Sequence, residues 1–182
     1  MLLESTYDNL GEILPPFILK DAKEIQYARD EVMGDNGIFL CFTCNHCPYA
    51  IAVWDRVITL AEYAKDLGVS TVAINPNINP SYPEDSPSNM LKMIEDRGIS
   101  FPYLVDEDQS VSKNYGAICT PDNYLLNREG RLVYRGRIDD NWKDANAVTQ
   151  ENLKIAISEL SKGVSVKGQQ YPSMGCSIKW CD

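Results

Sequence analysis

The sequence predicts a single α/β domain in which a strand, a helix and a second strand follow one another. Gly37 to Leu40 form a short apolar run that predicts a buried strand. Apolar side chains then recur at helical spacing over residues 50–67, and Gly68 can end that helix. Residues 69–75 are rich in β-branched side chains, which favours a second buried strand parallel to the first. The length of 182 residues suits one domain with a sizeable core.

Two further strands are expected before this unit. Residues 17–20 and 25–28 flank a turn at Asp21 and predict a short β-hairpin. Residues 34–37, Gly-Asp-Asn-Gly, have the composition of a turn and lead into the central strand. We therefore expect an N-terminal hairpin ahead of the central strand.

The segment after the second buried strand is expected to be an irregular loop, because it is too rich in proline for regular structure. Its prolines are Pro76, Pro80, Pro83 and Pro87. A long loop beside a site is often functional, and a rigid crossing of the surface explains the prolines equally well. Ser88 then predicts the start of a helix that runs to Arg97 and ends at Gly98.

The C-terminal half predicts a strand, a brief helix, a hairpin and a final helix. Residues 101–105 favour a strand, and Asp108 can cap a short helix that ends at Gly116. Proline at the head of a strand marks either a strand start or a special peptide bond, and Thr120-Pro121 has this position. The remaining expected elements are a strand at 122–126, a turn at 127–130, a strand at 131–137, a helix from Thr149 to Gly163 and a tail from residue 164.

Charge and composition limit the partners and the compartment. The chain carries 26 acidic and 17 basic side chains, a net charge of −9, which argues against nucleic acid and anionic membrane surfaces as partners. The first residues have neither the basic nor the apolar segment of a secretory signal, and no stretch is long enough to span a bilayer. We therefore expect a reducing cytoplasm, in which the six cysteines are free or catalytic rather than a disulfide framework.

The most informative stretch is residues 41–49, Cys-Phe-Thr-Cys-Asn-His-Cys-Pro-Tyr. It contains three of the six cysteines and the only histidine, and it lies between the central strand and the helix. A Cys-x-x-Cys pair at such a junction predicts a redox dithiol, here Cys44 and Cys47.

Thiolate chemistry suggests a role for each residue of this pair. A cysteine at a helix start meets unpaired N–H groups, which can lower its pKa from about 8.5 into the range of roughly 3.5–7.5. Cys44 is predicted to attack, and Cys47 to resolve the mixed disulfide. Positive charge on His46 would stabilise the Cys44 thiolate and make the pair more oxidising. Pro48 can place the helix start after Cys47, which would weaken the argument for Cys44.

A metal site is the alternative from a different class. Cys41, Cys44 and Cys47 form a C-x2-C-x2-C run, and Cys176 and Cys181 could supply a further ligand pair. Cys41 lies in an apolar strand, which favours a small buried side chain over a working thiol. The main prediction therefore assigns no metal and no other cofactor, and a non-catalytic metal-binding protein remains the alternative.

The order of strand, Cys-x-x-Cys, helix, strand, helix, Thr-Pro, hairpin and helix resembles the thioredoxin fold. The N-terminal hairpin and the segment inserted from about residue 76 to residue 115 make it similar to the redoxin branch, the AhpC/TSA and TlpA-like group. Several motifs resemble a soluble bacterial family of this branch over nearly the whole chain from about Pro15. These motifs are CNHCPY at 44–49, YPEDSP at 82–87, CTPD at 119–122, YRGRIDD at 134–140 and GCSIKW at 175–180.

The resemblance implies a mixed central sheet with helices on both faces. It implies that Pro121 is a cis-proline facing the dithiol and that it exposes the backbone of Thr120 to a substrate chain. Asn45 and His46 would support the site. Residues 1–165 would form the redoxin domain, and residues 166–182 a cysteine-containing tail packed on or near it. The expected partners are a protein or small-molecule disulfide, or a peroxide, and an external thiol reductant.

The predicted function is thiol–disulfide exchange by Cys44 and Cys47, and a thiol-dependent peroxidase using Cys44 is the alternative enzyme. Peroxiredoxins carry a cysteine three positions after the motif threonine and an arginine nearby, whereas Thr43 is followed by His46 and no arginine is close in sequence. TlpA-type reductases often carry a carboxylate where this chain has Ala50.

Three further cysteines are candidates for extra redox thiols. Cys119 adjoins Thr120-Pro121, and Cys176 and Cys181 lie in the tail. If the tail folds back over the dithiol, Cys176 or Cys181 could relay oxidising equivalents from Cys47. Simple packing of Cys119 and Cys176, and a loose thiol at Cys181, are the alternatives.

Overall fold

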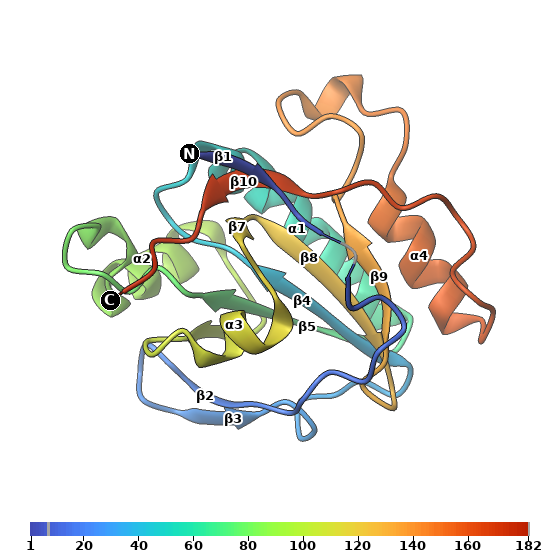
Figure 1. Ribbon diagram of the computed structural model, residues 1–182, viewed down its shortest axis with the longest axis horizontal. Helices are drawn as coiled ribbons and strands as arrows, with labels where there is room; N and C mark the ends of the chain where they lie inside the picture. The colour runs from blue at the N-terminus through green and yellow to red at the C-terminus, as the bar shows by residue number, and fades with distance from the viewer. Residues whose placement is uncertain (7, 182) are drawn as a thin grey trace.

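A mixed sheet of seven strands forms the centre of the computed structural model, which describes residues 1–6 and 8–181 (Figure 1). The strand order is β3-β2-β6-β5-β4-β8-β9, in which β4 is parallel to β5 and antiparallel to β8. The strands are β2 (Ile18–Asp21), β3 (Gln26–Ala28), β4 (Gly37–Phe42), β5 (Val69–Asn75), β6 (Tyr103–Val105), β8 (Asp122–Asn127) and β9 (Leu132–Gly136).

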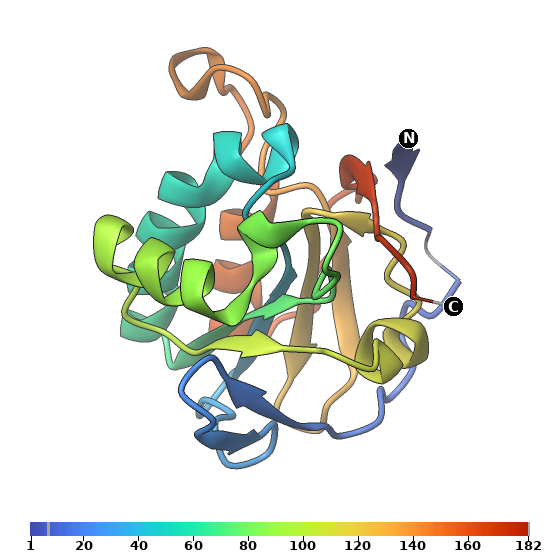
Figure 2. The same cartoon turned by 90° about the vertical axis from the view of Figure 1, so that its left-hand side faces the viewer.

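Helices cover both faces of this sheet (Figure 2). On one face lie α1 (Pro48–Asp66), α2 (Pro87–Arg97) and α4 (Asn152–Ser161); on the other lies α3 (Ser110–Tyr115). Alternate side chains of β4 enter two separate cores, because successive residues of a strand point to opposite faces. Phe39 and Cys41 face α1, while Leu40 and Phe42 lie in the core that contains Tyr115 of α3. Among the described helices, none combines the length and the apolar content that a bilayer crossing needs.

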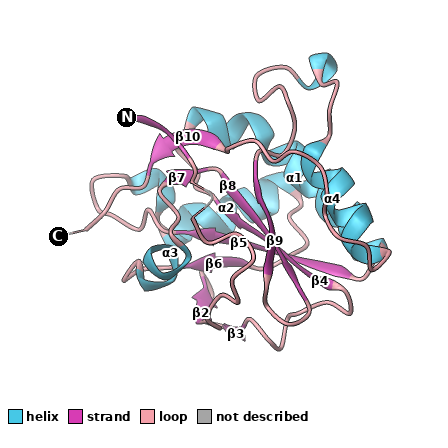
Figure 3. Cartoon of the chain, turned by 45° about the vertical axis from the view of Figure 1, so that its right-hand side comes forward, coloured by secondary structure: helices cyan, strands magenta, loops and turns pink. Residues whose placement is uncertain are grey.

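A second, three-stranded sheet lies beside the first (Figures 1 and 3). It consists of β1 (Leu2–Glu4), β10 (Met174–Ser177) and β7 (Cys119–Thr120), with β10 in the middle and antiparallel to both neighbours. The register places Cys176 opposite Thr120 and Ser177 opposite Cys119. The N-terminal strand β1 and the C-terminal strand β10 therefore meet next to the Thr-Pro segment, and no sequence pattern predicted β1.

The structure confirms the predicted strand–helix–strand unit, which is β4, α1 and β5, and the predicted N-terminal hairpin. The second buried strand has the predicted bounds, and β2 pairs antiparallel with β3. The helix after the Cys-x-x-Cys begins at Pro48. Proline is favoured at the first helical position, because the N–H that it lacks would have no partner within the helix. The mixed sheet with helices on both faces is also as expected.

Three local predictions are wrong. The proline-rich loop contains a 3-10 turn, Pro83–Asp85, because proline suits the first position of such a turn. Helix α2 begins one residue before Ser88, which instead shares a hydrogen bond with Ser86. Thr149 does not cap α4, because its hydroxyl and its N–H both donate to Asp140.

The brief helix α3 begins at Ser110, two residues after the predicted cap. The Asp108 carboxylate accepts from the N–H of Ser110, as a local turn. The buried Asp106 carboxylate accepts from the N–H groups of Val111 and Ser112. Asp106 therefore satisfies the first turn of the helix.

A buried ion pair fixes the strand that follows Thr120-Pro121. Arg135 of β9 donates to the Asp122 carboxylate at 2.9 Å and to the carbonyl oxygen of Gly116 at 2.7 Å. Both charged side chains are fully buried. Removing one member of such a pair leaves the other charge without a partner and without water.

We expect Arg135→Leu to lower the free energy of unfolding by about 3–5 kcal/mol, because it leaves the Asp122 carboxylate buried and unpaired. The measurement is urea unfolding followed by circular dichroism. Arg128→Leu is the matched control, because both contacts of Arg128 with Asp35 are exposed: 3.8 Å to the carboxylate and a 3.1 Å hydrogen bond to the carbonyl oxygen. Its effect should stay within about 0.5 kcal/mol. Equal effects of the two substitutions would contradict the structural role of the buried pair.

Candidate active site

The two cysteines of the motif meet between the end of β4, the start of α1 and β7. Both thiols are free and both side chains are fully buried. The Cys44 Sγ lies 3.2 Å from the hydroxyl of Thr120, and the Cys47 thiol donates to the carbonyl oxygen of Thr120 at 3.1 Å. The Thr120–Pro121 peptide bond is cis. We call Cys44 and Cys47 the dithiol from here on.

The start of α1 distinguishes the two thiols. Pro48 is the first helical residue, and Cys47 before it has the extended backbone that a following proline favours, with φ −71° and ψ 123°. Cys47 is therefore the N-cap residue, at the positive end of the helix dipole. Cys44 lies outside the helix, where the Trp54 indole donates to its carbonyl oxygen at 3.3 Å.

The contacts around the dithiol favour negative charge on Cys47 over negative charge on Cys44. The Cys44 thiol donates to Cys47 and, with the Cys176 side chain and the N–H groups of Ala50 and Cys176, lowers the pKa of Cys47 to about 5 against the effect of burial. Burial, the hydrogen bond to Cys47 and the charge of Asp85 raise the pKa of Cys44 well above its ordinary value. The helix start at Pro48 thus favours a thiolate on Cys47, whereas the sequence predicted one on Cys44, and the role of Cys44 as the attacking thiol stays a prediction.

Asp85, on the 3-10 turn of the proline-rich loop, holds the residues between the two cysteines. Its fully buried carboxylate accepts from the N–H of Asn45 at 2.6 Å and from the amide of Asn75 at 3.1 Å, and it contacts Nδ1 of His46. The imidazole of His46 also stacks on Tyr82, with 4.8 Å between the ring centroids. Any positive charge on His46 is thus paired with a carboxylate, and Asp85 opposes the predicted stabilisation of a Cys44 thiolate.

Asn45 anchors the same turn through its side chain. Its amide donates to the carbonyl oxygen of Glu84 at 2.9 Å and accepts from the Tyr103 hydroxyl at 2.9 Å. No sequence pattern identified Asp85, Asn75 or Tyr103 as site residues. The only signal for Asp85 was its place in the YPEDSP motif, to which no role was assigned.

The remaining cysteines have different surroundings. Cys176 packs against the dithiol, whereas Cys181 is exposed at the end of the tail. Cys41 lies in the core against α1, and Cys119 is buried with its thiol 3.7 Å from the carbonyl oxygen of Pro121. Burial raises the pKa of both Cys41 and Cys119, so neither is an activated thiol.

The structure does not assemble the predicted metal ligands. Among the described residues, the group of three side chains that could hold a metal ion is Cys44, His46 and Asp85, with ligand atoms within 4.8 Å of one another. Cys41 is not part of this group, because β4 directs it into the core. His46 and Asp85 already contact each other. A metal site built on Cys41, Cys44 and Cys47 is therefore wrong.

The backbone of Thr120 is not open to a substrate chain in this structure. β10 pairs with β7 along this edge, with Cys176 opposite Thr120. Gly175 lies so close that a Cβ there would be 2.0 Å from the carbonyl oxygen of Thr120. The expectation of an exposed docking edge is therefore wrong, because the tail of the chain occupies it.

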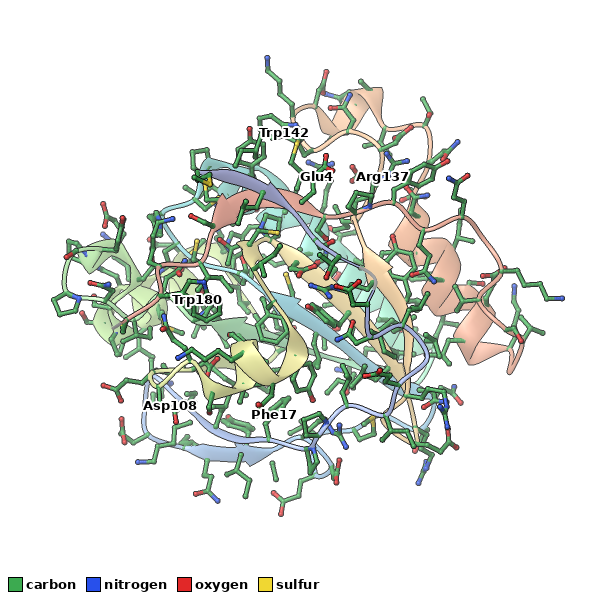
Figure 4. The ribbon with its side chains drawn as sticks, in the orientation of Figure 1. Glu4, Phe17, Asp108, Arg137, Trp142 and Trp180 are labelled. Carbon is green, nitrogen blue, oxygen red and sulfur yellow. The ribbon has the colours of Figure 1, made fainter. Side chains whose placement is uncertain are left out.

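A cavity of about 310 Å³ opens beside Pro121. Pro121, Val53 and Met174 supply part of its wall, and Glu4 and Arg137 bring opposite charges to it. Figure 4 labels Glu4, Arg137 and Trp142 at this end of the molecule. Trp142 packs on Tyr49 of α1, with ring centroids 4.2 Å apart, so the cavity wall is continuous with the start of that helix.

The sequence and the fold are similar to those of known redox proteins. Residues 10–135 match the model of the AhpC/TSA family. The thiol-disulfide oxidoreductase ResA of Halalkalibacterium halodurans is 29% identical over 124 residues, which cover 68% of this chain and 65% of that protein. The alignment thus spans just under two thirds of this relative.

Solved structures establish the fold. An uncharacterized conserved protein from Geobacillus kaustophilus is 42% identical with a TM-score of 0.93, covering 100% of this chain and 97% of that chain. The exposed lipoprotein thioredoxin Etrx1 of Streptococcus pneumoniae has a TM-score of 0.60 at 18% identity, covering 82% of this chain and 100% of that chain. The expected thioredoxin-like fold is confirmed.

We expect the reduced protein to show one thiolate transition near pH 5 that belongs to Cys47. Thiolate absorbance in the ultraviolet should rise as the pH increases through this value, and Cys47→Ser should abolish the rise. Because the folded-state pKa lies below that of an unfolded cysteine, the stability that the thiolate contributes is lost as the pH falls toward 5. Cys181→Ser is the control. A transition that survives in Cys47→Ser but disappears in Cys44→Ser would contradict the assignment.

We expect Asp85→Asn to lower the pKa of Cys44, because the charge of Asp85 is one cause of its elevation. The same substitution should lower the free energy of unfolding by about 1–3 kcal/mol, since a charged acceptor of buried donors is lost. Thiolate absorbance at alkaline pH and urea unfolding measure the two effects. Glu84→Gln, at the exposed neighbouring position, should leave both unchanged. An unaltered Cys44 transition in Asp85→Asn would refute this role.

Proposed function

The chain belongs to the AhpC/TSA family, and from this premise we propose that it is a thiol–disulfide oxidoreductase whose redox pair is Cys44 and Cys47. The observation that carries the proposal is the meeting of two free thiols at Thr120, one of them with a strongly lowered pKa. Exchange requires a thiolate, and this arrangement supplies one at neutral pH. The similarity to a protein named thiol-disulfide oxidoreductase supports the same class of reaction.

The exchange starts from the thiolate of Cys47. It attacks one sulfur of a substrate disulfide, forms a mixed disulfide and releases the first substrate thiolate. Cys44 then loses its proton and attacks Cys47, which closes the Cys44–Cys47 disulfide and releases the second substrate thiolate. The roles of the two cysteines are thus the reverse of those predicted from the sequence.

Asp85 and His46 are placed to receive the proton that Cys44 gives up. The Cys44 Sγ, a ring nitrogen of His46 and a carboxylate oxygen of Asp85 lie within 4.8 Å of one another. Both proton acceptors are held by the contacts of the proline-rich loop, so they do not have to reorganise during the exchange. An external thiol reductant then reopens the disulfide.

The lowered pKa of Cys47 affects the equilibrium between the reduced and the oxidised forms of the dithiol. A thiolate stabilised below neutral pH favours the reduced form of the pair. The Cys44–Cys47 disulfide is therefore a stronger oxidant than a disulfide between two unperturbed thiols. We propose a disulfide or dithiol substrate and an external thiol as partners.

Equilibration of the protein with reduced and oxidised glutathione, followed by acid quenching, alkylation and peptide mapping, tests the function. We expect a Cys44–Cys47 disulfide in the wild type. We also expect the protein to catalyse the reduction of oxidised glutathione by dithiothreitol, at a rate that falls to the protein-free rate in Cys47→Ser. Cys181→Ser, changed at an exposed thiol, should behave as the wild type. A wild-type protein that neither forms this disulfide nor turns over would refute the proposal.

A thiol-dependent peroxidase is the second candidate, and the Cys47 thiolate is the observation that favours it, because the thiolate is the form that a peroxide oxidises. One equivalent of hydrogen peroxide, added to the reduced protein and quenched by alkylation, separates the two functions. Sulfenic acid or its derived disulfide within seconds would support the peroxidase. Slow oxidation, together with fast exchange with a disulfide, supports the oxidoreductase.

A further inference from the structure

The C-terminal strand brings a third thiol to the dithiol. β10 pairs with β7, and the register places Cys176 opposite Thr120, the residue that both thiols of the dithiol contact. The Cys176 side chain packs against Cys44 and Cys47 and donates to the sulfur of Cys47. Cys47 therefore lies between two thiols, one before it in the motif and one from the tail.

The three thiols differ in access from solvent. The side chains of Cys44 and Cys47 are fully buried, whereas Cys176 is only partly buried. A thiol or disulfide in solution therefore meets Cys176 before it can meet either member of the dithiol. Cys181 is exposed; its sulfur lies 4.0 Å from the side-chain amide of Asn79, and its N–H donates to the side chain of Gln109.

Several contacts hold Cys176 in this position. β10 has a partner strand on each side. The backbone of Gly175 packs so closely against the carbonyl group of Thr120 that no side chain would fit between them. After the strand, the N–H of Ile178 donates to the carbonyl oxygen of Ile118 at 3.0 Å. The N–H of Lys179 donates to the side chain of Asn77 at 2.8 Å. The tail is thus fixed on both sides of Cys176.

We infer that Cys176 is a third redox thiol, which forms a disulfide with Cys47 and carries the exchange between the buried dithiol and thiols in solution. This inference rests on the proposed function of the dithiol. It assigns to the tail a catalytic group placed where a substrate cysteine would otherwise meet the pair.

We call this route through Cys176 the relay, and it consists of two thiol–disulfide exchanges. Cys176 loses its proton as it attacks Cys47 of the oxidised pair. The Cys47–Cys176 bond forms, the Cys44–Cys47 bond breaks, and Cys44 leaves with the electron pair and takes up that proton. An external dithiol then attacks Cys176, and Cys47 leaves as a thiolate. The second thiol of that dithiol displaces Cys176, so the external dithiol becomes a disulfide and the protein carries three reduced thiols.

Cys47 is the leaving group of the second exchange, and its pKa favours that step. Exchange is faster when the departing thiol has a low pKa, and the pKa of Cys47 is about 5. Burial and the hydrogen bond that it donates to Cys47 raise the pKa of Cys176 to about 11. An attack on the sulfur of Cys176 therefore expels the better leaving group, and the external thiol is directed to the accessible sulfur.

Disulfide mapping in Cys44→Ser tests the first bond. Treated with one equivalent of oxidised glutathione, this variant should form a Cys47–Cys176 disulfide, found by peptide mapping after alkylation. In the double variant Cys44→Ser/Cys176→Ser, glutathione should instead remain on Cys47. A Cys44→Ser protein that keeps glutathione on Cys47, with Cys176 alkylated, would overturn the relay.

Reduction kinetics test the second exchange. The oxidised wild type, Cys176→Ser and Cys176→Ala are mixed with dithiothreitol and quenched by alkylation at timed intervals. We expect reduction to slow at least about tenfold in both variants, because the external thiol must then reach a buried sulfur. Cys181→Ser should match the wild type, and the unfolding midpoint of each variant checks that it is folded.

The outcomes separate the relay from the proposed function. If Cys176→Ser forms the Cys44–Cys47 disulfide and is reduced as fast as the wild type, the relay is wrong and the oxidoreductase stands. If the wild type forms no Cys44–Cys47 disulfide, both proposals fail. A Cys47–Cys176 disulfide in Cys44→Ser, together with slow reduction of the Cys176 variants, supports the relay.

Discussion

The structure of the site depends on the contacts of one residue, Thr120. Its hydroxyl lies against the Cys44 sulfur, its carbonyl oxygen lies 3.1 Å from the Cys47 sulfur and accepts from it when that thiol is protonated, and its backbone pairs with the strand that carries Cys176. The buried ion pair between Arg135 and Asp122 fixes the strand that begins two residues later. Three thiols from two distant parts of the chain therefore meet at a point that the central sheet holds rigid.

A second constraint, the proline after the motif, sets the electrostatics of these thiols. Pro48 makes Cys47 the residue at the helix start, where the amides and neighbouring thiols favour a negative charge. Cys44 is left beside Asp85, whose charge opposes a second thiolate. In the proposed exchange, this asymmetry lets one thiol attack or leave as an anion while its partner stays protonated until the pair closes.

The inserted segment and the tail complete the site. The proline-rich loop supplies Asp85 and Tyr82, which hold His46 and the turn between the cysteines. The tail covers the Thr120 edge and supplies Cys176. Segments outside the central strand–helix–strand unit thus decide which sulfur is accessible and where a proton can go.

The sequence alone determined the strand–helix–strand unit, the N-terminal hairpin, the helix start at Pro48 as one of two possibilities, and the dithiol itself. These features depend on local periodicity, turn residues and the spacing of Cys44 and Cys47, all of which act within a few residues. Only the tertiary structure decided that Cys47 is the N-cap residue of α1, that Asp85 faces His46, and that Cys176 reaches the dithiol. Asp85 lies 39 residues from His46 in the chain, and Cys176 meets Thr120 through strand pairing. No local pattern specifies such contacts, because they arise from the register and packing of elements that are far apart in the sequence.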